Sequence, residues 1–306
     1  MYDLAIIGGG PGGVAAGVYA SRKHLKTVFI TEDFGGQSTV SPEIQNWIGE
    51  ISISGPALAK KLKDHLLAYA DGFVMVAEAE RVTHIEPIAG GFLITTKKKT
   101  YEAKTVLVTV GATRKRLMVP GAEEFDQKGL TYCASCDGPL FAGTDVAVVG
   151  GGNAAFETAA QLLAYAKSVT LLHHGPEFKA DPVTVKRVLS NPKMKALLNA
   201  ETLEIKGDKF VNGLIYEDKD TKEKHELPVG GVFVEIGLIP NTDFVKNIVK
   251  LDAYGRIVTD PYTQMTSTPG IWAAGDVTDG KYHQNNISAG DAVKALEDIY
   301  GYLHMR

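Results

Sequence analysis

The feature that most limits how this chain can fold is a glycine-rich motif that occurs twice, each time between an apolar run and a helical pattern. Residues 2–20 read YDLAIIGGGPGGVAAGVYA, where Gly8, Gly10 and Gly13 open an alanine-rich helix. Residues 145–174 repeat this order around residues 150–155. We name residues 8–13 the first glycine loop and residues 150–155 the second. Two such strand, loop and helix units predict two Rossmann-like halves.

In the first glycine loop each glycine has its own physical role. Gly8 permits the tight turn, Gly10 lets a pyrophosphate approach the backbone, and Gly13 lets the helix pack closely on the strand. The next apolar run, KTVFITE, ends in Glu32, which is placed to bind a ribose hydroxyl. The first loop therefore predicts a dinucleotide site, although a tight turn without any ligand is the alternative.

The second glycine loop contains Gly150, Gly152 and Ala155, after a valine-rich strand and before a second helical pattern. The strand that follows ends near His173. This repeat predicts a site for a second nucleotide or the remnant of one, with a ligand-free turn again as the alternative.

The rest of the chain is consistent with two domains. Residues 73–112 alternate in polarity like antiparallel strands, with turns at AGG and KKK, and residues 202–227 show a similar hairpin pattern. Short strands and a closing helix from about Ser288 are expected to rejoin the first domain. We therefore expect an α/β fold of two Rossmann-like nucleotide-binding domains, the second inserted into the first. Residues 1–116 and 245–306 would form the outer domain and residues 117–244 the inserted one.

Charge and hydropathy exclude several classes of protein. Lys and Arg number 32 against 36 Asp and Glu, so no basic surplus exists to bind nucleic acid. No apolar run reaches the 18 residues that a membrane span needs. The opening MYDLAIIGGG lacks the features of a signal peptide, so we expect a cytoplasmic protein.

Both cysteines of the chain, Cys133 and Cys136, lie in TYCASCDGPL. A structural disulfide is unexpected in a reducing cytosol, and one pair supplies only half of the ligands of a structural zinc site. We predict no metal site. A redox-active pair is the better interpretation.

Together these motifs resemble one family over nearly the whole chain, namely the low-molecular-weight thioredoxin reductases, which are class II FAD-dependent pyridine nucleotide-disulfide oxidoreductases. The reductase portion of the alkyl hydroperoxide reductase flavoprotein is similar as well. The motifs that carry the resemblance are GGGPGG, FGGQ at 34–37, IQNW, CASCDGPLF, GGGNAAFETA, GLIPNT at 237–242 and AAGD at 273–276.

This resemblance implies a bound FAD and roles for the redox residues. Cys136 would face the flavin, Cys133 would attack the protein substrate, and Asp137 would supply protons, although Asp137 could instead be an ordinary helix N-cap. The resemblance also implies that Gln37 and Asn46 lie near the flavin. The remaining residues implied to contact FAD are Gly8, Gly10, Gly13, Glu32, Gly111 near the dinucleotide, Asp276 at the ribitol chain and Gln284 at the isoalloxazine ring.

The resemblance is weakest at the residues that would select the electron donor. NADPH-using thioredoxin reductases carry His-Arg-Arg and a further Arg four residues on, whereas this chain reads HHGPEFKAD at residues 173–181. His174, Gly175 and Lys179 replace the arginines that would bind a 2′-phosphate. PEFKAD resembles NADH-using relatives, but these have Glu in place of His173, which we expect to be a surface residue at a strand end. NADH is favoured over NADPH, and a ferredoxin or deazaflavin donor stays open.

We expect no thioredoxin-like module before Tyr2, and we therefore expect a separate thioredoxin or glutaredoxin-like protein to accept the electrons. Family resemblance also suggests a homodimer. Two rival hypotheses remain: a flavoprotein redox sensor with a degenerate second site, and a ferredoxin-NADP reductase of the same fold, whose members lack the Cys-x-x-Cys motif.

Overall fold

The computed structural model describes residues 1–41, 43–70 and 72–305. It divides into two compact units: unit 1 comprises Met1–Thr113 and Ile239–Arg306, and unit 2 comprises Arg114–Leu238. Unit 2 is thus inserted into unit 1. The strands in which the chain crosses between units, β7 (Ala112–Arg114) and β16 (Leu238–Pro240), pair with each other.

The crossings lie a few residues before the expected boundaries at 116/117 and 244/245. Phe244 and Val245, near the second boundary, pack in the apolar core of unit 1. The division therefore falls at the paired strands and not at the loops beyond them.

Unit 1 is built on a seven-stranded sheet with the order β3-β2-β1-β6-β5-β4, and β17 pairs with β6 beside this path. The pairs of β1 with β2 and β6 are parallel, whereas β4, β5 and β6 form the antiparallel excursion that the AGG and KKK turns predicted. The strands are β1 (Tyr2–Ile7), β2 (Thr27–Thr31), β3 (Val74–Glu78), β4 (Val82–Ile88), β5 (Gly91–Thr96), β6 (Thr100–Val108) and β17 (Ile271–Ala273).

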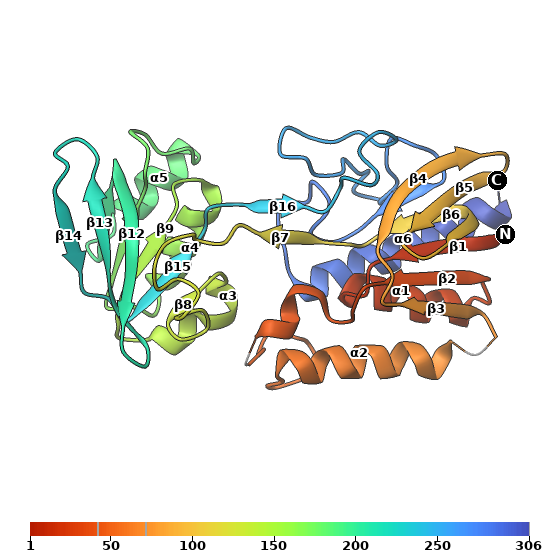
Figure 1. Cartoon of the computed structure of the whole chain (residues 1–306), viewed down its shortest axis with the longest axis horizontal. Coiled ribbons are helices and arrows are strands. Elements are labelled where there is room, and N and C mark those ends of the chain that lie inside the picture. Colours follow the sequence, from red (N-terminus) through yellow and green to blue (C-terminus); the bar gives the residue numbers. More distant parts are fainter. Residues whose placement is uncertain (42, 71, 306) are drawn as a thin grey trace. The chain divides into compact units, whose positions relative to one another are not determined.

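Three helices and a short 3-10 turn complete unit 1: α1 (Pro11–Arg22), η1 (Gly36–Val40), α2 (Gly55–Tyr69) and α6 (Asn285–Met305). In Figure 1, α1 lies between α2 and α6. Helix α2 was not predicted from the sequence. Ser54 caps its N-terminus by accepting a hydrogen bond from the backbone N–H of Ala57, and Leu58, Leu62 and Leu66 bury one face.

Unit 2 has a parallel five-stranded sheet with the order β11-β10-β9-β15-β8 and a separate antiparallel sheet of β12, β13 and β14. Apolar cores cover both faces of the parallel sheet. Its elements are β8 (Leu130–Thr131), α3 (Ala134–Asp137), η2 (Gly138–Phe141), β9 (Asp145–Val149), α4 (Asn153–Leu162), β10 (Ser168–Leu172), α5 (Pro182–Leu189), β11 (Met194–Leu197), β12 (Ala200–Gly207), β13 (Val211–Asp218), β14 (Lys224–Leu227) and β15 (Gly231–Val234). The predicted α/β class, with one nucleotide-type domain inserted into another, is confirmed.

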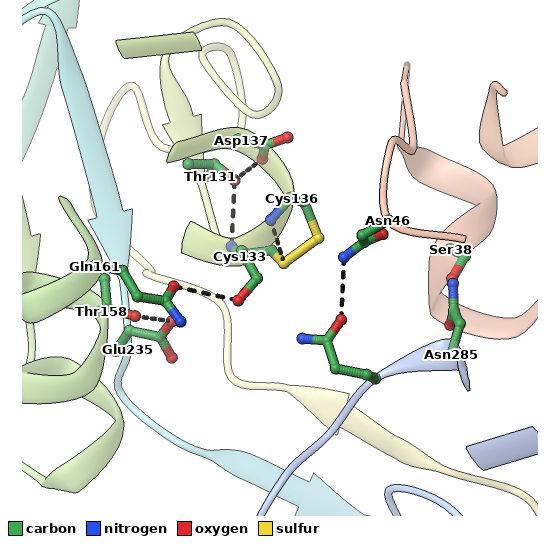
Figure 2. The surroundings of a disulfide bond; sticks show 12 residues. Ser38, Asn46, Thr131, Cys133, Cys136, Asp137, Thr158, Gln161, Glu235 and Asn285 are labelled. Carbon is green, nitrogen blue, oxygen red and sulfur yellow. Dashed lines mark hydrogen bonds between the residues drawn. A yellow bond between two sulfur atoms is a disulfide. The ribbon is translucent and has the colours of Figure 1, made fainter. Parts of the chain in front are cut away.

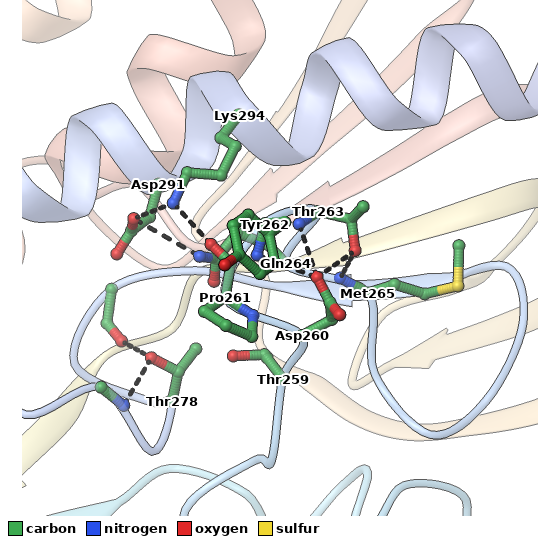
Figure 3. A network of polar contacts seen from close by, with 12 residues as sticks. Thr259, Asp260, Pro261, Tyr262, Thr263, Gln264, Met265, Thr278, Asp291 and Lys294 are labelled. Carbon is green, nitrogen blue, oxygen red and sulfur yellow. Dashed lines mark hydrogen bonds and ion pairs between the residues drawn. The ribbon is translucent and has the colours of Figure 1, made fainter.

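The segment that leads into β17 is irregular and is held by polar contacts (Figure 3). One carboxylate oxygen of Asp260 accepts the backbone N–H groups of Tyr262 and Thr263 at 2.8 and 2.9 Å. Lys294 on α6 donates to the carbonyl oxygen of Pro261 at 2.9 Å. These bonds fix the loop against α6. Within the described ranges, no helix has the length and apolar character to cross a membrane.

Candidate functional site

The first glycine loop has the geometry that its sequence predicts. A β-carbon on Gly8, whose φ is 116°, would lie 2.5 Å from the carbonyl oxygen of Thr109, and one on Gly13 would lie 1.8 Å from that of Gly8. A β-carbon on Gly10 would have no heavy atom within 4 Å. Packing therefore requires glycine at the first and third positions, whereas Gly10 leaves open space at the start of α1.

A pocket of about 600 Å³ opens at this loop within unit 1, a size typical of cofactor sites. Its wall also includes Asn285 and Ser288, from the first turn of α6, where helix N–H groups favour negative charge. Predicted FAD residues in the wall are Gly8, Gly10, Glu32, Gln37, Gly111 and Asp276.

Two of the predicted FAD residues in this wall are carboxylates with cationic or polar neighbours. Glu32, directly after β2, lies 3.4 Å from a guanidinium nitrogen of Arg81. Asp276 has one oxygen 3.5 Å from both the Ser288 hydroxyl and Nδ1 of His283. Both carboxylates line the open space of this pocket.

The amide residues predicted near the flavin divide into two groups. Gln37 lines the pocket and donates its side-chain N–H to the carbonyl oxygen of Ala112. Asn46 instead donates from Nδ2 to Oε1 of Gln284 at 3.0 Å, which ties the Asn46 loop to the start of α6 (Figure 2). That helix begins at Asn285, earlier than the expected Ser288, because the Ser288 N–H already bonds the Gln284 carbonyl at 2.9 Å.

Cys133 and Cys136 form a disulfide in unit 2, with their α-carbons 5.3 Å apart. Cys133 is the N-cap of α3, and its sulfur accepts the backbone N–H of Cys136 at 3.2 Å (Figure 2). An N–H aimed at a sulfur stabilises a thiolate once the disulfide is reduced. Both cysteine residues are partly exposed, so the pair is accessible to chemistry.

Asp137 is buried, with 7% of its surface exposed, one turn after Cys133. Burial raises the pKa of its carboxyl, opposed by a hydrogen bond from the Thr131 hydroxyl and by the charge of Arg114. Asp137 occupies the N-cap position of η2, but its side chain makes no capping hydrogen bond there. Thr131 was not predicted as a site residue, although a hydroxyl two residues before the first cysteine was the available signal.

The second glycine loop repeats the geometry of the first. A β-carbon on Gly150 would lie 2.3 Å from the carbonyl oxygen of Glu235 and 3.0 Å from the β-carbon of Ala155. A β-carbon on Gly152 would again meet nothing within 4 Å. Open space at the start of α4 is what a second pyrophosphate would need.

His173 is not the surface residue that we expected, because only 5% of it is exposed. A β-carbon on Gly151 would lie 2.2 Å from Nδ1 of His173, so the ring fills space that the glycine leaves free. Neither ring nitrogen makes a hydrogen bond of ordinary geometry within the described residues, and burial lowers the pKa of the imidazole. The following segment runs along the loop, since Lys179 donates its N–H to the carbonyl oxygen of Gly151 at 2.8 Å.

Comparison with known proteins adds independent information. The model of the family described as pyridine nucleotide-disulphide oxidoreductase matches residues 2–292. A protein named NADH dehydrogenase from Bacillus subtilis (strain 168) is 40% identical over 99% of this chain and 58% of its own length. A component of alkyl hydroperoxide reductase from Pseudomonas putida is 39% identical, with 99% and 58% covered. The chain thus spans a little over half the length of these curated relatives.

Among solved structures, thioredoxin reductase from Streptococcus pyogenes MGAS5005 is 36% identical and superposes with a TM-score of 0.91. The match covers 100% of this chain and 99% of that one. The likeness therefore extends over both units and not over one nucleotide-type domain alone.

Proposed function

The chain belongs to the pyridine nucleotide-disulphide oxidoreductase family, as its motifs predicted. We infer that it is an FAD-dependent disulfide oxidoreductase of the thioredoxin reductase type. From that premise we propose that it passes electrons from NADH, through FAD and the Cys133–Cys136 disulfide, to a thioredoxin or glutaredoxin-like protein. The observation that carries the proposal is a Cys-x-x-Cys disulfide followed by a buried acid in a unit with its own nucleotide-type loop.

Anaerobic titration of the oxidised protein tests this proposal by counting electrons. A flavin and a redox-active disulfide together take up four electrons per chain, whereas a flavin alone takes up two. Uptake of two electrons by wild type would reject the role of the disulfide. The Cys133→Ser/Cys136→Ser double variant is the control and should take up two.

FAD fits the first glycine loop because Gly10 opens to free space while Gly8 and Gly13 close the turn beneath it. We assign the pyrophosphate to this loop, a ribose hydroxyl to Glu32 and the ribitol chain to Asp276, with Gln37, Asn46, Gly111 and Gln284 as the further contacts. When bound, FAD supplies two-electron transfer between a nicotinamide and a disulfide.

The two cysteines have different roles in this proposal. Reduction of their disulfide takes two electrons and two protons and leaves two thiols. Cys136 is the sulfur that receives the electrons, and Cys133 is the nucleophile that attacks the disulfide of the partner protein. Asp137, whose pKa is raised by burial, donates and accepts the proton at these sulfurs.

For the electron donor we infer NADH. The space above Gly152 and the N-terminus of α4 support retention of a dinucleotide. His174, Gly175 and Lys179 supply no bidentate group for a 2′-phosphate, so NADPH gains nothing over NADH. The relative named NADH dehydrogenase supports the same choice.

A second candidate function follows from the same segment. Because neither the arginines nor an acidic group for a ribose hydroxyl is present at residues 173–175, the second loop could be a remnant in a flavoprotein that takes electrons from ferredoxin or a deazaflavin, or that senses redox state. Stopped-flow reduction by NADH, compared with reduction by a reduced ferredoxin, separates these candidates. Fast reduction by ferredoxin alone favours the second.

Family likeness also leads us to infer a cytoplasmic homodimer. Light scattering coupled to size-exclusion chromatography tests the oligomeric state. A monomer over the working concentration range would reject the dimer without affecting the proposed reaction.

A further inference from the structure

Glu235 lies directly beside the second glycine loop, although the sequence analysis did not single it out. It follows β15, and its backbone N–H donates to the carbonyl oxygen of Val149 at the end of β9, at 2.8 Å. Its own carbonyl oxygen occupies the space that a β-carbon on Gly150 would need, at 2.3 Å. Its position at the mouth of this loop is therefore fixed by the backbone.

The side chain of Glu235 is held by one of its two oxygens. The hydroxyl of Thr158 on α4 donates to Oε1 at 2.9 Å, as Figure 2 shows. Among the described residues Oε2 accepts no hydrogen bond, and it is not one of the fully buried unpaired atoms. One carboxylate oxygen is thus anchored to the helix while the other is available to a ligand.

Sheet topology indicates which part of a dinucleotide would meet this oxygen. From β9 the chain passes through α4 to β10 on one side, whereas β15 adjoins β9 on the other. The carboxyl ends of β9 and β15 therefore flank the switch point of the sheet, where dinucleotides bind. With the pyrophosphate at the glycine loop and the adenosine toward β10, the nicotinamide half extends over the end of β15.

The surroundings of Glu235 shift the pKa of its carboxyl in both directions. Burial raises the pKa of its carboxyl and the exposed Glu157 adds to this, while the Thr158 hydroxyl and the charge of Arg114 oppose it. A carboxylate whose burial is only partly compensated gains from a hydrogen-bond donor or a positive charge brought by a ligand.

We propose that Glu235 binds the nicotinamide half of the pyridine nucleotide, with its free oxygen accepting a hydrogen bond from the carboxamide. This inference rests on the proposed use of NADH. The carboxylate attracts the positively charged oxidised ring more strongly than the neutral reduced ring, so Glu235 favours the form that remains after NADH has given up its electrons. Glu235 thereby sets which oxidation state of the nucleotide binds better.

Equilibrium binding to the oxidised, FAD-loaded protein tests this assignment with three nucleotides, none of which reduces the flavin. They are NAD⁺, tetrahydro-NAD with an uncharged ring, and ADP-ribose, which lacks nicotinamide. For Glu235→Gln we expect NAD⁺ to bind about tenfold more weakly, as for loss of a charge-assisted hydrogen bond. Tetrahydro-NAD should lose less affinity, and ADP-ribose should change less than about twofold, which also shows that the variant is folded.

Glu223→Gln is the matched control, because Glu223 is a well exposed acid elsewhere in unit 2 and should leave all three affinities unchanged. Unchanged NAD⁺ binding by Glu235→Gln would overturn the assignment and leave NADH as the donor. Equal weakening of ADP-ribose and NAD⁺ would also overturn it, because the residue would then only support the loop. If the wild type bound neither NAD⁺ nor tetrahydro-NAD, the proposed use of NADH would be rejected. The role of Glu235 would then be rejected with it.

Discussion

The hydroxyl of Thr131 donates a hydrogen bond to the buried carboxylate of Asp137, in the turn that carries both cysteines. The same hydroxyl accepts the backbone N–H of Cys133 at 3.3 Å. Burial favours the neutral carboxyl, whereas the hydrogen bond from Thr131 favours the carboxylate. Burial outweighs this bond and raises the pKa of Asp137, which suits a group that exchanges protons.

Replacing Asp137 by Asn should slow turnover with a disulfide partner about a hundredfold, within the range for loss of an acid–base group. Reduction of the flavin by the donor should be unaffected. Thr131→Val removes the bond that lowers the pKa of Asp137, so the activity profile should shift to higher pH with a smaller loss of rate. Stopped-flow and steady-state assays from pH 5 to 9 measure both effects. An Asp137→Asn variant with normal turnover would contradict the proton role.

Asp137→Asn should also stabilise the fold at neutral pH. Because the folded pKa of Asp137 is raised, the wild type is favoured at low pH and loses stability as the pH rises through that value. Asn has no such titration, so the variant should gain on the wild type with increasing pH, by on the order of 1 kcal/mol. That corresponds to a few degrees in the melting temperature. Melting curves of the oxidised proteins at pH 4 and pH 8 would refute this if the difference did not grow.

Glutamate in place of the middle glycine should separate the two nucleotide sites. Gly10→Glu and Gly152→Glu each point into open space, so both proteins should fold. The added carboxylate should repel a pyrophosphate. We expect Gly10→Glu to purify without FAD, and Gly152→Glu to keep FAD but lose pyridine nucleotide binding. Flavin absorbance per chain measures the first result, and a yellow, fully loaded Gly10→Glu protein would disprove the assignment.

The two cysteines should differ in their ability to trap a partner. Cys136→Ser leaves Cys133 as a free nucleophile, which should form a stable mixed disulfide with a thioredoxin that retains one cysteine. Cys133→Ser should form little. Non-reducing electrophoresis and mass spectrometry identify the adduct. Trapping by Cys133→Ser instead would reverse the proposed division between the sulfurs.

Donor preference should follow the composition of residues 173–181. We expect NADPH to reduce the flavin no faster than NADH. His174→Arg with Lys179→Arg should improve NADPH selectively, each arginine contributing about 1.5 to 3 kcal/mol through a charge-assisted bond. Gly175 is left unchanged, because a β-carbon there would lie 2.8 Å from Nε2 of the buried His173. A strong NADPH preference in wild type would show that another cation, such as Arg187 on α5, holds the phosphate.

Local sequence patterns were enough to predict many features of this molecule. The glycine spacing predicted both loops, and the open space at Gly10 and Gly152 matches the separate role given to each glycine. The antiparallel strands around AGG and KKK followed from alternating polarity. These features depend on residues only a few positions apart, so their determinants are contained in the local sequence.

What the sequence determined by itself was therefore the antiparallel strands around AGG and KKK, the two nucleotide-type loops and the place of the cysteine pair. Only the tertiary structure decided that His173 is buried under Gly151, that Thr131 bonds Asp137, and that Glu235 adjoins Gly150. Asn46 and Gln284 meet although 238 residues separate them. Burial and hydrogen-bond partners arise when distant segments pack together, and one local pattern is compatible with many such arrangements until the whole core has formed.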